Sequence, residues 1–267
     1  MRGLIGVVHL PAMPGDPQHR EGGFAEVIEA ARRDAAALAE GGVEALIVEN
    51  FGSAPFPKGT PEQPTPPHQI AALALAVDAC RRESDRPVGV NVLRNDARAA
   101  LGVAAATGAV FVRVNVHVGA YVTDQGVIEG RAFETLRERR VLGVERVAIL
   151  ADVRVKHAAP LAEAPIEDEV RDALHRGLAD AVVVSGAGTG EPVERARLEA
   201  VRAAAGDAVV LVGSGLTPER AESLAPLADG AIVGTWLKVG GDVRAPVDAA
   251  RVRTLADAVR GRWRPTA

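Results

Sequence analysis

The stretch VVLVGSG, residues Val209–Gly215, decides the fold of this chain. It is a short apolar run that ends in glycine, and AIVGT, residues Ala231–Thr235, repeats the arrangement further along. A buried strand that ends in glycine before a helix start leaves backbone N–H groups unpaired, and such groups bind phosphate. The last two loops of a (β/α)8 barrel form a phosphate site of this kind. The two turns therefore predict a (β/α)8 (TIM) barrel whose phosphate-binding residues are Gly213, Ser214, Gly215, Gly234 and Thr235.

Length, composition and charge fit one domain of this type. The chain has 267 residues, of which 48% are hydrophobic, and one such barrel typically has ~250 residues. Acidic and basic residues are interspersed and the formal net charge is -4, so we expect no nucleic-acid partner. No apolar run approaches the ~20 residues of a membrane helix, so we expect no integral membrane association. We predict one domain over residues 1–267.

Cysteine usage and the first residues indicate the compartment. Cys80 is the only cysteine, which rules out an internal disulfide and a cysteine-built metal site and is typical of a reducing cytosol. The first strand-like run meets Pro11 and Pro14 too soon for a signal peptide. We therefore expect a cytoplasmic protein. A homo-oligomer is expected only from the general frequency of dimers.

Strand and helix patterns alternate along the whole chain. Eight short β-rich runs are expected at residues 4–9, 45–50, 88–92, 110–116, 147–152, 181–185, 209–212 and 230–233. Alanine-rich segments with helical spacing follow them at residues 24–40, 67–83, 96–107, 131–142, 166–176, 193–204, 218–227 and 247–262. Such βα units predict parallel strands with right-handed crossovers. An open doubly wound sheet is the alternative, and the paired glycine turns favour the closed barrel.

Three connections that leave strands are long, and in a barrel they share the C-terminal rim, where ligands bind. They cover residues 51–66, 117–130 and 153–165. Five prolines stiffen the first, which is expected to be a fixed wall. The glycine-bearing loop 119–130 is the expected lid.

Polar residues inside the strands mark a site at this rim. Period-two alternation over residues 110–116 points the valines at the helices and Arg113 and Asn115 at the barrel axis. A buried guanidinium needs a carboxylate or an anionic ligand. Other strands supply polar residues at the same level, namely Glu49, Asn50, Asn91, Asp152 and Ser185.

These residues also have a purely structural interpretation. Arg113 with Glu49 or Asp152 would then be an ion pair that fills the barrel, and Asn91 and Asn115 would tie backbone groups together. We favour a ligand role because the residues come from several strands and gather below a phosphate turn.

Histidine and lysine residues at strand ends add acid–base groups. His9 ends the first strand and is a candidate general acid or base. Lys156 is a candidate for phosphate binding, or for a Schiff base if it is desolvated. A divalent metal held by His9, Glu49, His117 and Asp152 is chemically allowed, but no HxH or HExxH spacing supports it, so we predict no metal and no cofactor. The glycine-rich run 185–190 is expected to line the polar end of the ligand, or to be a tight turn only.

Several long strings in this chain resemble the BtpA family. They are HLP at residues 9–11, IVENFG at 47–52, GVNVLRND at 89–96, FVRVN at 111–115, YVTDQG at 121–126, DV at 152–153 with VKH at 155–157, and VGSG at 212–215. The resemblance implies a barrel of the ribulose-phosphate-binding type. The family name derives from cyanobacterial proteins needed for stable photosystem I, and similar proteins occur in organisms without photosynthesis. Some relatives carry the label nucleosidase.

Two functions are therefore predicted from the sequence. The first is an enzyme that acts on a phosphorylated sugar, nucleoside or similar small metabolite by acid–base chemistry. Its catalytic residues would be Glu49, Asp152, His9 and Arg113, and its substrate-binding residues Asn50, Asn91, Asn115, Lys156 and Ser185. The alternative is a noncatalytic assembly factor for photosystem I, as the family name suggests.

Overall fold

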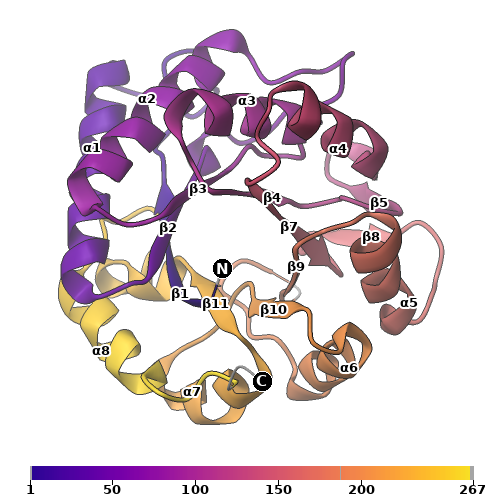
Figure 1. The fold of residues 1–267 in the computed structure, drawn as a ribbon. Helices are drawn as coiled ribbons and strands as arrows, with labels where there is room; N and C mark the ends of the chain where they lie inside the picture. Colours follow the sequence, from indigo (N-terminus) through magenta and orange to yellow (C-terminus); the bar gives the residue numbers. More distant parts are fainter. Residues whose placement is uncertain (1, 187, 265–267) are drawn as a thin grey trace.

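Eight parallel strands form a closed barrel, which confirms the predicted (β/α)8 fold (Figure 1). The computed structural model describes residues 2–186 and 188–264. Around the barrel the strands follow the order β1-β11-β10-β9-β7-β4-β3-β2, and the gaps in numbering are short strands outside it. The barrel strands are β1 (Gly3–His9), β2 (Ala45–Glu49), β3 (Val88–Asn91), β4 (Phe111–Val114), β7 (Ala148–Val153), β9 (Ala181–Val184), β10 (Val209–Val212) and β11 (Gly230–Val233).

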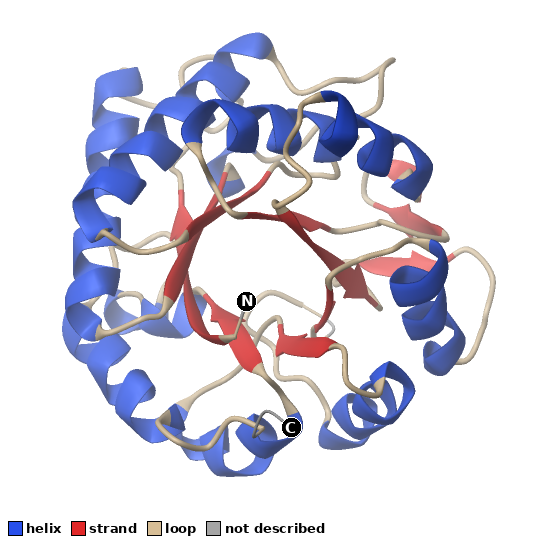
Figure 2. Cartoon of the chain, viewed as in Figure 1, coloured by secondary structure: helices blue, strands red, loops and turns tan. Residues whose placement is uncertain are grey.

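The helices form an outer ring around the barrel (Figure 2). In the described part of the chain they are α1 (Phe24–Gly41), α2 (Pro67–Ser84), α3 (Ala97–Thr107), α4 (Ala132–Val141), α5 (Ile166–Arg171), α6 (Arg195–Ala205), α7 (Pro218–Leu224) and α8 (Ala249–Val259). Each lies inside a predicted helical range to within a few residues. The range 166–176 ends in a π-helical turn, Asp172–Arg176, rather than as regular α-helix.

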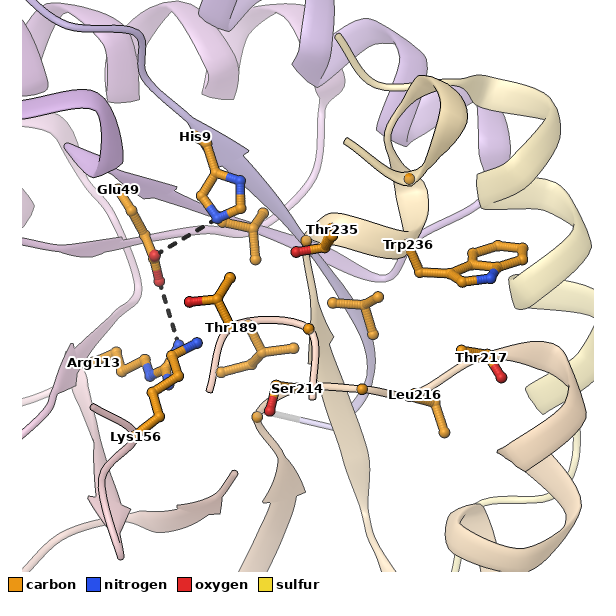
Figure 3. A pocket seen from close by; sticks show the side chains of 18 residues that line it. His9, Glu49, Arg113, Lys156, Thr189, Ser214, Leu216, Thr217, Thr235 and Trp236 are labelled. Carbon is orange, nitrogen blue, oxygen red and sulfur yellow. Dashed lines mark hydrogen bonds and ion pairs between the residues drawn. The ribbon is translucent and has the colours of Figure 1, made fainter. Parts of the chain in front are cut away.

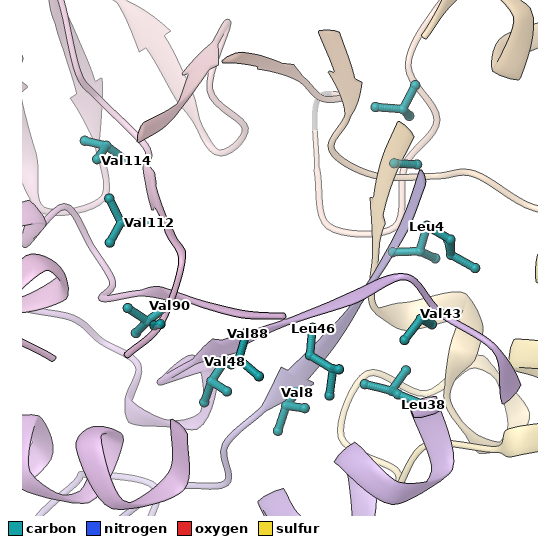
Figure 4. Packing of buried hydrophobic residues seen from close by; sticks show 14 of the residues in the cluster. Leu4, Val8, Leu38, Val43, Leu46, Val48, Val88, Val90, Val112 and Val114 are labelled. Atoms are coloured by element: carbon teal, nitrogen blue, oxygen red, sulfur yellow. The ribbon is translucent and has the colours of Figure 1, made fainter. Parts of the chain in front are cut away.

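The valine-rich strands are buried on both faces, as parallel strands of a barrel must be. One face packs against the helices, where Leu46 and Val48 of β2 belong to the larger apolar cluster (Figure 4). The other face fills the barrel, where Phe111 and Leu150 belong to a second cluster. Gly89 makes room for the Phe111 ring, because a Cβ at residue 89 would lie 2.2 Å from it.

The predicted lid at residues 119–130 is instead part of a small antiparallel sheet. β5 (Ala120–Thr123) pairs with β6 (Gly126–Glu129) on one edge and with β8 (Ala158–Pro160) on the other. The side chain of Tyr121 is buried, and its hydroxyl donates a hydrogen bond to Glu169 of α5. The sequence analysis did not predict these strands, because strands this short have too few alternating residues to be recognised.

The chain after β11 also differs from the prediction. The expected helix start at Gly234 is a short 3-10 helix, η4 (Thr235–Leu237), and α8 begins only at Ala249. Lys238 follows η4, is buried, and donates to Asp34 of α1 at 2.7 Å. The same carboxylate accepts from the backbone N–H of Val247 at 3.0 Å. This ion pair fastens the last βα unit to the first helix.

Candidate functional site

Strand register brings polar side chains together at the C-terminal ends of the barrel strands. His9 of β1 lies opposite Glu49 of β2, and Glu49 lies opposite Asn91 of β3. Arg113 of β4 lies opposite Leu150 of β7, and Asp152 is two residues further on. Because side chains alternate with period two, Arg113 and Asp152 share the inner face of the barrel.

Arg113 is the centre of this cluster. Its Nε and Nη2 donate to the two carboxylate oxygens of Asp152 at 2.8 and 2.9 Å, and its Nη1 donates to Glu49 Oε1 at 3.4 Å. Burial disfavours the guanidinium charge, but the two carboxylates outweigh burial and raise the pKa of Arg113 above its ordinary value. Arg113 is therefore a fixed buried cation.

The two carboxylates are not equivalent. Asp152 accepts three hydrogen bonds, two from Arg113 and one from Asn115 Nδ2 at 2.9 Å. Glu49 accepts on Oε1, from Arg113 and from Asn91 Nδ2 at 3.2 Å. Within the described residues Glu49 Oε2 accepts no hydrogen bond, and His9 Nε2 lies 3.9 Å from it, which is too long for one. Among the carboxylate oxygens of Glu49 and Asp152, Glu49 Oε2 is thus the one without a donor in the described residues.

His9 is a largely buried, neutral imidazole beside Glu49, with 9% of its side chain exposed. Burial, followed by the charges of Lys238, Lys156 and Arg113, lowers the pKa of His9 well below its ordinary value. Its ring lies 4.5 Å from that of Phe51, centroid to centroid. Gly234 leaves space for this ring, because a Cβ there would lie 2.5 Å from His9 Cε1. The 3.9 Å contact with Glu49 is therefore not an ion pair.

The two glycine turns lie side by side and line one cavity of about 150 Å³, together with His9, Glu49, Arg113 and Lys156 (Figure 3). Considering the described residues only, three consecutive backbone amides in each turn have no hydrogen-bond acceptor. They belong to Ser214, Gly215, Leu216, Gly234, Thr235 and Trp236. The hydroxyl of Ser214 is engaged, because it accepts from the Gly186 N–H and donates to the Glu191 carbonyl. Anion binding here would therefore use backbone amides.

A second cavity of about 350 Å³ adjoins the first and shares His9, Glu49, Arg113, Lys156 and Thr189 with it. Its other lining residues include Asn91, Arg94 and Asn115. Asn115 Oδ1 is buried and has no hydrogen-bond partner among the described residues. Lys156 lies where the cavities meet, and burial, followed by the charge of Arg113, lowers its pKa to about 8. This mixed surface can bind polar groups and move protons.

Three predicted site residues lie outside both cavity linings. Asn50 donates to the Leu93 carbonyl at 3.2 Å and accepts from the Leu93 N–H at 2.7 Å, so its side chain fixes backbone. Ser185 Oγ lies beneath the first glycine turn, where a Cβ on Gly213 would be 2.3 Å away. Asp152 lies behind Arg113. His117, named for a metal site, contacts the Gly177 carbonyl at 2.8 Å, and no metal-binding group of three His, Cys, Asp or Glu residues exists in ranges 2–186 and 188–264.

Comparison with known proteins agrees with this architecture. The BtpA family model matches residues 1–261. The chain belongs to the BtpA family. It is 45% identical to Photosystem I biogenesis protein BtpA of Synechocystis over 96% of this chain and 87% of that protein. It is 46% identical to an uncharacterized protein of Thermococcus kodakarensis over 95% of this chain and 94% of that one.

The BtpA-family chain also resembles solved barrels in fold. One is orotidine 5'-phosphate decarboxylase from Pyrococcus horikoshii, with a TM-score of 0.58 at 15% identity over 97% of this chain and 100% of that one. At this identity the likeness concerns the fold. Within the part of this chain that the structure covers, no helix combines the length and hydrophobicity needed to cross a bilayer.

Sequence reasoning did not name Arg94 as a site residue, and it named Thr189 only as part of the run 185–190. Arg94 is buried, lines the larger cavity and donates from Nη2 to the Lys156 carbonyl at 2.8 Å. Thr189 lines both cavities, and its hydroxyl lies 2.9 Å from His157 Nε2. Arg94 directly follows the third strand, so its place at the rim could have suggested it. Thr189 was expected only with the rest of the run 185–190, because its own position depends on how this glycine-rich loop folds back.

Proposed function

We propose that this protein is a cytoplasmic enzyme that binds a small phosphorylated metabolite, such as a phosphorylated sugar or nucleoside, and transforms it by acid–base chemistry. One observation carries the proposal. The residues whose amides are unpaired in the two glycine turns line the same cavity as Glu49, His9, Arg113 and Lys156. Packing a barrel core does not require such a combination, whereas holding a phosphate beside reacting groups does.

Each group has a distinct part in the proposed reaction. The amides of the glycine turns bind the phosphate and so fix the substrate relative to the barrel axis. Glu49 transfers the proton through Oε2, with neutral His9 beside it. Arg113 stabilises negative charge that develops on the substrate, and Asp152 is a positioning residue that holds Arg113 in place. Asn91 and Asn115 orient hydroxyl groups in the larger cavity.

Inorganic phosphate tests the binding half of this proposal. A ligand bound only by the folded protein stabilises it by RT ln(1 + [L]/Kd), which is about 2.7 kcal/mol at a hundred times Kd. We expect millimolar phosphate to raise Tm in a thermal-shift assay, relative to sodium chloride at matched ionic strength. Equal Tm values in phosphate and chloride, and in a panel of phosphorylated sugars and nucleosides, would contradict the proposal.

A noncatalytic role in photosystem I assembly is the second candidate. The name of the Synechocystis relative, which is 45% identical to this chain, supports it. An assembly factor must bind other proteins, and α4 carries two exposed apolar side chains, Phe133 and Val141, at 65% and 80% exposure. Flotation of cell membranes separates the candidates, because only an assembly role requires the protein to travel with them. Membrane-bound protein in the absence of a phosphate effect on Tm would favour the second role.

A further inference from the structure

The position of Lys156 singles it out among the lysines of the chain. The sequence contains three, namely Lys58, Lys156 and Lys238. Lys238 is buried and bound to Asp34, and Lys58 lines neither of the two site cavities. Lys156 lines both cavities and lies between the glycine turns and the side chains of Asn91 and Asn115. Its backbone is held in place by the hydrogen bond from Arg94.

The surroundings of the Lys156 amine lower its pKa to about 8 and so raise the share of its neutral form. Burial and the positive charge of Arg113, with that of Arg94, lower its pKa, and the carboxylates of Glu49 and Asp152 oppose this shift only in part because both accept hydrogen bonds from Arg113. Within the described residues, no hydrogen bond or ion pair of the Lys156 side chain is present, in contrast to Lys238 with Asp34. A neutral amine is a nucleophile, and its natural partner is a carbonyl carbon.

Resting on the function proposed above, we propose that the Lys156 amine forms a Schiff base with the carbonyl carbon of a phosphorylated aldehyde or ketone. The phosphate would lie on the glycine turns in the 150 Å³ cavity and the remainder of the substrate in the 350 Å³ cavity. Because Lys156 lines both, the reacting carbonyl would lie at their junction. Asn115 Oδ1, a buried acceptor without a partner among the described residues, would accept from a substrate hydroxyl.

The covalent step is an addition followed by loss of water. The nitrogen lone pair of Lys156 forms the C–N bond while the C=O π pair moves to oxygen, which takes up a proton as nitrogen releases one. The resulting hydroxyl group is protonated and leaves as water when the nitrogen lone pair forms the C=N bond. Overall, amine, carbonyl and one proton give an iminium ion and one water. Glu49, which lines the 150 Å³ cavity together with Lys156, would take the proton from nitrogen and return it to oxygen.

Reductive trapping with dihydroxyacetone phosphate tests this proposal in the full-length protein. Sodium cyanoborohydride adds hydride to the iminium carbon and leaves a stable secondary amine. Mass spectrometry should find one adduct per chain, on the peptide that contains Lys156. A pKa of about 8 in place of 10.5 raises the neutral fraction near pH 7 on the order of a hundredfold. We therefore expect labelling of Lys156 at least about tenfold faster than that of Lys58.

Matched variants and ligands serve as controls. Lys156→Arg keeps the positive charge and should abolish the adduct, and Lys156→Met, checked for folding by circular dichroism, should do the same. Lys58→Met should leave the adduct unchanged, because Lys58 lies outside both cavities. Inorganic phosphate should slow trapping by competing for the turns, and dihydroxyacetone, which has no phosphate, should label more slowly.

The outcomes separate this inference from the proposed function. A phosphate-dependent rise in Tm without an adduct on Lys156 would overturn the Schiff base and leave phosphate binding intact. Equal labelling of Lys58 and Lys156 would also overturn it, because that pattern is ordinary surface reactivity. Absence of both the Tm rise and the adduct would overturn the two proposals together.

Discussion

At the scale of single residues, the positive charge of Arg113 holds the buried carboxylates of Asp152 and Glu49 together. Replacing one partner of a buried ion cluster leaves the others uncompensated, which costs about 3–5 kcal/mol. We expect Arg113→Met to lower the free energy of unfolding by this amount in urea denaturation at pH 7. Asp152→Asn in the same chain should restore part of the loss, because the two residues share two hydrogen bonds.

Arg98→Met is the matched control for that variant. Arg98 is an arginine whose side chain is 78% exposed and pairs with Glu138 at 3.4 Å. Exposed pairs contribute about 0–1 kcal/mol. Equal losses for Arg98→Met and Arg113→Met would mean that the buried cluster contributes no more than a surface contact.

The pH dependence of Lys156 trapping is a second prediction at this scale. The charged and titratable groups around the amine are Arg113, Glu49, Asp152, Arg94, His9, His157 and Asp124. Burial first, and Arg113 next, lower its pKa to about 8, so the amine is protonated below that pH and neutral above it. The trapping rate should rise with pH, pass its midpoint at about 8 and then level off. A rate still rising near the ordinary value of 10.5 would contradict this assignment.

At the scale of elements, the turn after β10 depends on a residue without a side chain. Gly215 has φ +69°, and a Cβ there would lie 2.3 Å from the Pro192 Cα and 2.5 Å from the Glu191 carbonyl oxygen. Gly215→Ala should therefore displace the turn and abolish the phosphate-dependent rise in Tm. The control is Gly102→Ala in α3, where no atom lies within 4 Å and alanine should stabilise by about 0.5–1 kcal/mol. A phosphate effect of equal size in both variants would show that phosphate binds elsewhere.

Sequence patterns predicted the elements well where each strand is a buried run followed by a full helix. They failed where structure comes from pairing between distant segments, as with β5 and β8, or from a turn too short for periodicity, as with η4. The same distinction holds in the site. Alternation along β4 correctly placed Arg113 inside the barrel, but it could not show that Asn50 would turn to the Leu93 backbone instead of the cavity.

At the scale of the whole molecule, closure of the barrel brings the site together. Glu49 and the second glycine turn belong to opposite ends of the chain, yet they line one cavity because β1 pairs with both β2 and β11. The ion pair of Lys238 with Asp34 adds a contact between residues 204 positions apart. The site is therefore complete only when the barrel is closed. The separate halves of the chain would each carry an incomplete cavity.

The small sheet at the rim has an evolutionary consequence. Its central strand, β5, comes from the connection after β4, whereas β8 comes from the connection after β7. Insertions in one connection would break a ladder that the other connection completes. The two segments should therefore vary in concert among homologues, with lengths and pairing residues changing together while other rim loops diverge freely.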